Sequence, residues 1–297
     1  MSMLKTQAYQ AELSLIYTTL DSIFKNPPSS AYLTLFETGR YSTLAPSKQV
    51  RPLLTLLLGK HLKVPLEHLI QAACTVEIVH TYSLIHDDLP CMDDDDMRRN
   101  KPSLHKAYDE STAVLTGDFL LTLSFGLLSQ APHIEDSTKL SLIQTLSRRS
   151  GAEGMIGGQM MDLYFENKQA SLKALQAIHD KKTAALISAS LEFAGIIAKV
   201  EAKTMNSIQQ CGRHLGVLFQ IVDDILDHTS TEEALGKPIH SDIKNNKSTY
   251  VSLLGLSKAK EMATHHFEQV MTYLSKIEGQ DIIPLQNFCK LLLNRTF

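Results

Sequence analysis

The sequence predicts an all-α protein, a single-domain bundle of about ten helices. Apolar residues recur at spacings of three and four along most of the chain, and no run alternates as a half-buried strand does. Proline and glycine clusters mark the turns between these segments, but no break is long enough to be a domain linker, so residues 1–297 are expected to form one domain. The predicted helices span 3–24, 50–60, 66–88, 112–130, 137–165, 171–198, 203–228, 258–276 and 281–294.

Composition narrows the classes of function. Hydrophobic residues make up 43% of 297 residues, and the net charge of −3 gives no support for nucleic-acid binding. The four cysteines lack CxxC spacing, which favours a reducing compartment. Residues 1–10 do not resemble a signal peptide, and the apolar stretch 184–198 is too short to span a membrane. We therefore expect a cytoplasmic protein without stable membrane insertion.

A helical stretch ending at Asp227 carries three aspartates. Asp223 and Asp227 are four residues apart and share one helix face, with Asp224 one step around it. Their neighbours are apolar, and carboxylates on an apolar helix repel each other and resist burial. Mg²⁺ would relieve both effects, because it prefers oxygen ligands and is commonly shared between carboxylates and substrate phosphates. An acidic stripe facing water is the alternative.

A second acidic segment lies earlier in the chain, with six aspartates within residues 87–96. Pro90 disfavours helical geometry before it, so the preceding helix is expected to end near Asp88. Carboxylates at a helix C-terminus are unfavourable unless a cation compensates them. Arg98 and Arg99 follow directly, and arginine pairs bidentately with phosphate. The segment predicts metal ligands beside phosphate donors, with a solvated acidic loop as the alternative.

The two segments resemble the aspartate-rich motifs of trans-prenyl diphosphate synthases, the polyprenyl synthetases. Residues His80–Arg99 resemble the first motif and Gly216–Asp227 the second. Four residues separate Asp88 from Asp93, as in bacterial farnesyl diphosphate synthases (geranyltranstransferases) and plant-type geranylgeranyl enzymes. The resemblance runs from about Lys48 to the C-terminal helices. It implies an isoprenoid synthase-like bundle around a central active-site cavity, and a homodimer.

The resemblance also implies a magnesium site. Three Mg²⁺ ions are expected, with Mn²⁺ as a possible substitute. Their ligands would come from both aspartate clusters. The first cluster would contribute Asp87, Asp88 and Asp93, and the second Asp223, supported by Asp224 and Asp227.

Two diphosphate-binding groups follow from the same resemblance. Isopentenyl diphosphate would be held by Lys48, Arg51, His80 and Arg99. The allylic diphosphate and the reacting carbon would be surrounded by Arg98, Lys182, Thr183, Gln220, Lys237 and Lys247. The residues expected to act in catalysis are Asp87, Asp88, Arg98, Lys182, Thr183, Gln220, Asp223 and Lys237. The chain departs from the family pattern at Gln49, where arginine is usual, and at His240 and Asn246, where glycine is usual.

The implied reaction condenses isopentenyl diphosphate with dimethylallyl and then geranyl diphosphate, giving (2E,6E)-farnesyl diphosphate and diphosphate for isoprenoid biosynthesis. Metal ions and cationic side chains would stabilise the leaving diphosphate as the allylic cation forms. Tyr82 precedes Asp87 by five residues, roughly 7.5 Å along a helix axis. Its ring would form a floor under the growing chain, whereas Ser83 is small. In the family, an aromatic residue here fits a fifteen-carbon product.

Several alternatives stay open. Tyr82 could serve only in core packing, and the product could be geranylgeranyl diphosphate. A non-catalytic subunit of a heteromeric prenyltransferase would be expected to lose one aspartate cluster, whereas both are intact here. A terpene cyclase needs no second diphosphate pocket, so Lys48, Arg51 and His80 argue against that class. A helical cation-binding protein without diphosphate chemistry does not explain the two adjacent arginines.

Overall fold

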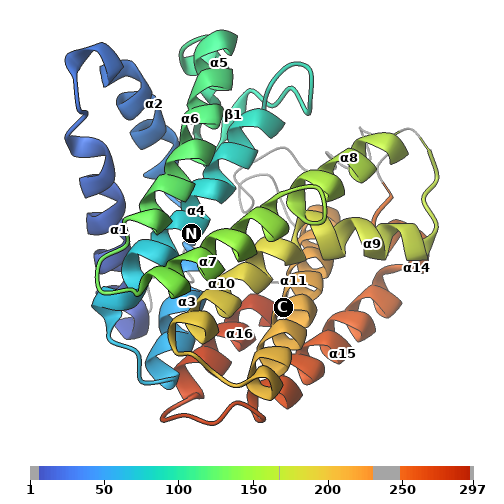
Figure 1. Cartoon of the computed structure of the whole chain (residues 1–297). Coiled ribbons are helices and arrows are strands. Elements are labelled where there is room, and N and C mark those ends of the chain that lie inside the picture. The colour runs from blue at the N-terminus through green and yellow to red at the C-terminus, as the bar shows by residue number, and fades with distance from the viewer. Residues whose placement is uncertain (1–6, 167, 230–247, 295–297) are drawn as a thin grey trace. The chain divides into compact units, whose positions relative to one another are not determined.

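The computed structural model describes residues 7–166, 168–229 and 248–294 (Figure 1). In these ranges the regular structure is helical, apart from one two-stranded hairpin formed by β1 (Met97–Arg98) and β2 (Lys101–Pro102). The all-α prediction is therefore confirmed. The chain divides into two compact units, Met1–Leu56 with Leu66–Ile143, and Leu57–Pro65 with Gln144–Phe297. That the two units form one domain stays a prediction.

The first unit is built around a long helix that is buried over most of its length. This helix is α4 (Leu66–Asp87), and it packs against α6 (Glu110–Ser129), α1 and α2. Its residues from Ala72 to Val79 are all buried. The other elements of the unit are η2 (Gln7–Tyr9), α1 (Gln10–Lys25), η3 (Ser30–Tyr32), α2 (Leu33–Thr43), α5 (Leu104–Ala107), and the first parts of α3 (Val50–His61) and α7 (Asp136–Ser150).

The second unit is organised around α11 (Ala202–Thr229), which packs against α10 (Ala184–Ile197) and α15 (Leu256–Leu274). Glycine allows the close approach of α10, because a Cβ atom at Gly216 would lie 2.3 Å from the Cβ of Ala184. Gly216 lies about two helical turns before Asp223, the first residue of the second aspartate cluster. The remaining helices are α8 (Met155–Phe165), α9 (Leu172–Lys182), α14 (Tyr250–Leu254) and α16 (Ile283–Leu293).

Two predicted helices are each broken into two. The segment predicted as one helix over 137–165 forms two helices, because α7 ends at Ser150 and α8 begins at Met155. A Cβ atom at Gly154 would lie 2.0 Å from the backbone oxygen of Arg149, so only glycine fits this turn. The segment 171–198 is interrupted at Thr183, between α9 and α10. The predictions also missed α2, the hairpin and the short helices α5 and α14.

One helix among the described residues, α6, is long and apolar enough to cross a membrane by length and composition alone. The apolar stretch considered as a membrane span from the sequence, 184–198, lies instead in the 14-residue buried helix α10. Only 33% of the apolar window of α6 is buried, and Val114 and Leu115 on it are 41% and 59% exposed. Asp118 lies on the same exposed stretch, and a charge in mid-helix is expensive in lipid.

Candidate active site

The first aspartate cluster begins where α4 ends. The helix stops at Asp87, as Pro90 predicted. The backbone N–H of Asp88 still donates to the oxygen of Leu84 at 3.0 Å, and the N–H of Asp93 donates to the oxygen of Asp87 at 2.9 Å. The loop thus folds back over the last turn and satisfies an orphan carbonyl. Asp87 and Asp93, two predicted metal ligands, are brought side by side.

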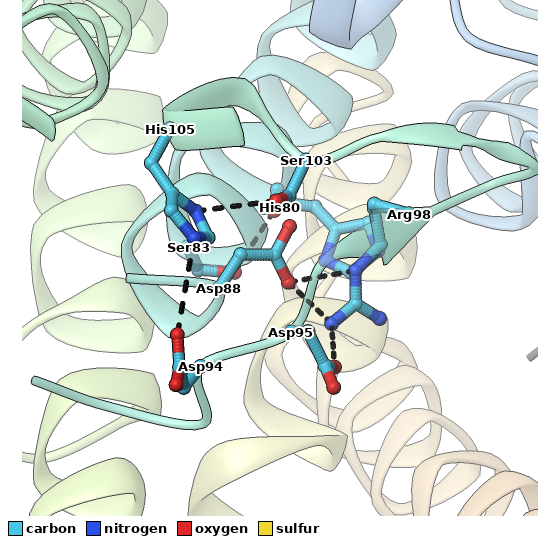
Figure 2. A network of polar contacts seen from close by, with 8 residues as sticks. All are labelled: His80, Ser83, Asp88, Asp94, Asp95, Arg98, Ser103 and His105. Atoms are coloured by element: carbon cyan, nitrogen blue, oxygen red, sulfur yellow. Dashed lines mark hydrogen bonds and ion pairs between the residues drawn. The ribbon is translucent and has the colours of Figure 1, made fainter. Parts of the chain in front are cut away.

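Asp88 and Arg98 form a buried ion pair (Figure 2). Asp88 is only 2% exposed, and its Oδ1 accepts from Arg98 Nε at 2.9 Å and from Nη2 at 2.5 Å. Arg98 Nη2 also donates to Asp95 Oδ2 at 2.9 Å. Burial raises the pKa of Asp88 to about 6, although Arg98 acts in the opposite direction. The Asp88 carboxylate is engaged with Arg98, and its predicted role as a metal ligand stays a prediction.

The hairpin fixes Arg99 in an unusual backbone conformation. Its two turn residues, Arg99 and Asn100, have φ angles of 54° and 61°, the left-handed pair that a two-residue hairpin turn requires. Arg99 Nη2 donates to Glu77 Oε1 at 3.1 Å, and the Glu77 side chain is 2% exposed. Arg99 Nη1 is buried without a hydrogen-bond partner in the described chain. An anion would satisfy this donor.

A neutral histidine lies close to three guanidinium groups. Burial, followed by the charges of Arg51, Arg99 and Arg98, lowers the pKa of His80 well below its usual 6.5. Arg51 is itself buried. Arg98 and Arg99 are each paired with a carboxylate, Asp88 and Glu77, so the donor left for an anion is the buried Nη1 of Arg99. The structure therefore gathers three of the four residues predicted to hold isopentenyl diphosphate.

The fourth residue, Lys48, is exposed and lies just before α3. The preceding loop tolerates the unusual Gln49, which has a φ of 47° and is 1% exposed. Gln49 Nε2 donates to Ser47 Oγ at 2.8 Å, and its backbone oxygen accepts from the N–H of Leu53 at 3.1 Å. The backbone carbonyl of Gln49 thus accepts the first hydrogen bond of α3, while its side chain contacts Ser47, and the departure from the family pattern does not disrupt the start of this helix.

A small cleft lies beside these charges within the first unit. Its charged lining comes from Asp88, Arg98, Arg99 and Lys101, and Thr81 and other α4 residues line it as well. The cleft is too small to hold a substrate in this conformation.

The second unit carries a continuous chain of hydrogen bonds. Thr183 Oγ1 donates to Gln220 Oε1 at 2.9 Å, and Gln220 Nε2 donates to Asp224 Oδ1 at 2.9 Å. The other Asp224 oxygen accepts from the backbone N–H of Tyr250 at 2.8 Å. Asp224 is 4% exposed. Both of its oxygens are used structurally, so it orients Gln220 and anchors α14.

Asp223 and Asp227 differ from Asp224. Asp223 is half-buried, and Asp227 is 6% exposed, with a buried Oδ1 that has no hydrogen-bond partner in the described ranges. An orphaned buried carboxylate oxygen is costly unless a cation or donor satisfies it. The residues of this helix face thus fit a divalent cation. At the end of α9, directly before Thr183, Lys182 Nζ is held by Asp162 Oδ2 at 2.7 Å.

Tyr82 is buried in the first unit and 4% exposed. Its ring packs edge-to-face against His86, with ring centroids 5.8 Å apart. Its hydroxyl is buried without a partner among the described residues, and burial raises its pKa. The neighbouring Ser83 hydroxyl donates to the backbone oxygen of His80 at 2.9 Å. These contacts leave the predicted floor role of the Tyr82 ring untested.

Some predicted site residues lie outside the described residues, and some observed partners of site residues were not predicted. Lys237 and Lys247, with the departures His240 and Asn246, lie outside the described residues. Three contacts were not predicted from the sequence: Arg99 with Glu77, Lys182 with Asp162, and Asp224 with the backbone N–H of Tyr250. Each partner is distant in sequence, and no local motif marks it.

Comparisons with known proteins agree with this arrangement of charges. The family model described as polyprenyl synthetase matches residues 33–282. The chain belongs to the polyprenyl synthetase family. The resemblance noted from the two aspartate-rich motifs is thereby confirmed.

Individual polyprenyl synthetases show the same relationship over most of their length. The chain is 41% identical to a farnesyl diphosphate synthase of Bacillus subtilis, covering 86% of each sequence. It is 40% identical to a chloroplastic geranylgeranyl pyrophosphate synthase of Capsicum annuum, over 84% of this chain and 69% of that one. A solved geranyltransferase from Helicobacter pylori, complexed with magnesium and isoprenyl diphosphate, has a TM-score of 0.82 at 36% identity, covering 98% and 97% of the chains.

Sequence identity alone does not decide the product of this polyprenyl synthetase. The fifteen-carbon and twenty-carbon relatives differ by one percentage point, 41% against 40%. Product length must therefore be argued from individual residues, and the chain-length role of Tyr82 stays a prediction.

Proposed function

We propose that this polyprenyl synthetase condenses isopentenyl diphosphate with dimethylallyl and then geranyl diphosphate, giving farnesyl diphosphate and free diphosphate for isoprenoid biosynthesis. The observation that carries the proposal is the clustering of His80 with Arg51, Arg98 and Arg99, next to an aspartate-rich loop. A site for a phosphate anion and a site for divalent cations then adjoin each other. Few reactions other than diphosphate chemistry need both.

Isopentenyl diphosphate is held by the basic residues of the first unit. Arg51 and Arg99 supply rigid bidentate donors, and the buried unpaired Nη1 of Arg99 is available for a phosphate oxygen. His80 donates a further hydrogen bond as a neutral imidazole. Lys48, exposed just before α3, adds a further positive charge.

We propose three Mg²⁺ ions, with Mn²⁺ able to replace them, which would neutralise charge on the allylic diphosphate. Their proposed ligands are Asp87, Asp93, Asp223 and Asp227. The buried unpartnered oxygen of Asp227 supports this assignment. Asp88 is expected to act chiefly by holding Arg98, and Asp224 by holding Gln220, because their oxygens already accept hydrogen bonds.

The protein's own groups stabilise the charges of the reaction. The allylic C–O bond breaks, and its electron pair stays with the departing diphosphate, which Arg98 and Lys182 are proposed to stabilise. The oxygen atoms of Thr183 and Gln220 present dipoles toward the allylic cation. The π-bond of isopentenyl diphosphate forms the new C–C bond, and the lost proton goes to the released diphosphate. Water must be excluded, because it would trap the cation.

Product length is proposed to be set by Tyr82, whose buried ring would stop the growing chain at fifteen carbons. The ring is held by packing against His86, so it cannot swing aside without displacing a second side chain. Geranylgeranyl diphosphate is the alternative product, and it requires that the chain pass this ring.

The protein is proposed to act in the cytoplasm as a homodimer that buries the exposed side of α6. The exposed Leu115 and Val114 support this contact. Leu115→Lys should then give a monomer in sedimentation velocity, whereas Leu140→Lys, an equally exposed leucine on α7 at 55%, should stay dimeric. Equal masses for both variants would contradict the α6 interface.

The reaction class is tested by omitting one substrate at a time. With Mg²⁺, dimethylallyl diphosphate and isopentenyl diphosphate, release of diphosphate should depend on both substrates. Diphosphate release from the allylic substrate alone, with a cyclic hydrocarbon product, would favour a terpene cyclase. No turnover with either combination would favour a non-catalytic subunit.

A further inference from the structure

Three residues beside the first aspartate cluster belong to none of the groups assigned above. They are Asp94, Asp96 and His105, and one potential ligand atom from each lies within 4.8 Å of the others. The side chains of Asp94 and Asp96 are 60% and 73% exposed, whereas the His105 side chain is 2% exposed. The cluster therefore joins a fixed imidazole to two adjustable carboxylates.

His105 points an unsatisfied nitrogen into this cluster (Figure 2). Its Nδ1 lies 3.2 Å from Ser103 Oγ. Its Nε2 is buried and has no hydrogen-bond partner among the described residues. When Nδ1–H donates to Ser103, the lone pair resides on Nε2, which is the tautomer that binds a metal ion.

The distance between His105 and Asp94 fits two ligands of one metal ion better than it fits a hydrogen bond. His105 Nε2 lies 4.0 Å from Asp94 Oδ1, too far for direct hydrogen bonding. Two ligands of one ion, each bonded at about 2.1 Å, lie up to roughly 4.2 Å apart. The exposed carboxylates can turn the remaining fraction of an ångström at little cost.

We propose that Asp94, Asp96 and His105 form a separate binding site for a divalent transition-metal ion, with Zn²⁺ as its representative. One imidazole and two carboxylates suit Zn²⁺ and neighbouring first-row ions, whereas Mg²⁺ prefers oxygen ligands alone. Ser103 supplies the outer hydrogen bond that orients the ligating imidazole. Water would complete the coordination on the exposed side.

Lys106 competes with the metal ion for this site. Its Nζ lies 2.9 Å from Asp96 Oδ1, and this pair lowers the pKa of Asp96. Both side chains are exposed, so the pair is easily exchanged for another cation. Removing the lysine charge in Lys106→Met should therefore raise the affinity for Zn²⁺ rather than lower it.

An occupied site would tie the loop to the following helix. Asp94 and Asp96 belong to the loop that also carries Asp93 and Asp95, whereas His105 belongs to α5. Metal binding would restrict this loop without using any of the aspartates proposed to hold Mg²⁺. Zn²⁺ binding to this site can be measured whether or not the proposed prenyltransferase activity is present.

The test is calorimetric titration of the full chain with Zn²⁺ in a large excess of Mg²⁺, which occupies the oxygen-only sites. One Zn²⁺ per chain should bind to the wild-type protein. Asp94→Asn and His105→Asn should each weaken binding about tenfold or more, and Lys106→Met should strengthen it. Two control variants should bind Zn²⁺ as the wild type does. His68→Asn alters the stacked pair His68–His133, and Asp136→Asn removes an exposed carboxylate.

Co²⁺ gives a second readout, because its visible absorption reports the ligands directly. The wild-type spectrum should change in His105→Asn and not in His68→Asn. If His105→Asn fails to fold, the exposed Asp94→Asn and Asp96→Asn variants carry the test. Unchanged Zn²⁺ affinity in both aspartate variants, or Zn²⁺ binding that His68→Asn abolishes, would overturn the proposal.

Discussion

The guanidinium of Arg98 holds the buried carboxylate of Asp88 through two of its nitrogen atoms, at 2.9 and 2.5 Å. The first arginine of the loop is thus anchored to the last turn of α4. Because Asp88 is 2% exposed, this pair differs from the exposed contacts around it, and it links the position of a cationic group to the end of the helix that carries Asp87.

The first prediction concerns this pair. Arg98→Met leaves the Asp88 carboxylate buried without its partner, which should lower the free energy of unfolding by about 3 kcal/mol. The matched control is Lys106→Met, which breaks the exposed pair with Asp96 in the same loop and should leave the unfolding midpoint near that of the wild type. Urea denaturation of both variants measures the difference. Equal midpoints would mean that the Arg98 pair contributes no more than a surface contact.

The second prediction separates two neighbouring aspartates. Asp224→Ala removes the acceptor of the Tyr250 N–H and of Gln220 Nε2, and should cost about 3 kcal/mol of stability, because two donors lose their partner. Asp223→Asn should unfold like the wild type within about 1 kcal/mol, yet lower turnover about 100-fold as a loss of electrostatic stabilisation. Thermal unfolding and steady-state kinetics on both variants check this. A stability loss in Asp223→Asn equal to that of Asp224→Ala would contradict the division of roles.

The third prediction concerns product length. Tyr82→Ala should shift the products from fifteen carbons to twenty or more, because the buried ring no longer blocks the chain. Tyr82→Phe is the matched control: it keeps the ring and removes only a buried hydroxyl that lacks a described partner, so farnesyl diphosphate should remain the product. Mass spectrometry of the products decides. The same distribution from Tyr82→Ala and Tyr82→Phe would assign Tyr82 to core packing alone.

The fourth prediction concerns pH and stability. Burial lowers the pKa of His179 to about 4, below the unfolded value of 6.5. The unfolded state then binds more protons between pH 4 and 6.5, so this contribution is complete above pH 6.5 and is lost as the pH falls through that window. His179 alone should account for a loss of about 2 kcal/mol between pH 7.5 and pH 5.

His179→Phe should reduce this loss of stability at low pH. His266, whose pKa burial and His214 lower to about 4, should still contribute in that variant. Urea unfolding at pH 7.5 and pH 5 compares the wild type, His179→Phe and His266→Phe. An identical pH dependence in all three proteins would show that these histidines do not control acid stability.

The helical class and the end of α4 could be predicted from the sequence, because both depend on local rules. Apolar periodicity marks the helices, and Pro90 stops the helix that carries Asp87. The break at Gly154 was missed although four glycines fall within residues 151–158, because the apolar periodicity on both sides was assigned to one helix and the glycines were not given the weight of a helix end. The hairpin was missed because its turn is Arg99-Asn100 rather than a sequence rich in glycine.

The candidate site shows the same division between local and distant information. Asp87, Asp88 and Arg98 are close in sequence, so their proximity follows from one helix end and one loop. The contacts that hold the cationic groups are distant, as for Arg99 with Glu77 and Lys182 with Asp162. Only tertiary packing brings these pairs together. Which predicted ligand is already paired, as Asp88 is, also depends on that packing.

The most direct measurement of the central claim is the mass of the product made from dimethylallyl diphosphate and an excess of isopentenyl diphosphate with Mg²⁺. We predict farnesyl diphosphate as the end product, formed through geranyl diphosphate and abolished by chelation of the metal. A main product of twenty or more carbons would contradict the role of Tyr82. The absence of any condensation product, with folded protein and Mg²⁺ present, would contradict the proposed function itself.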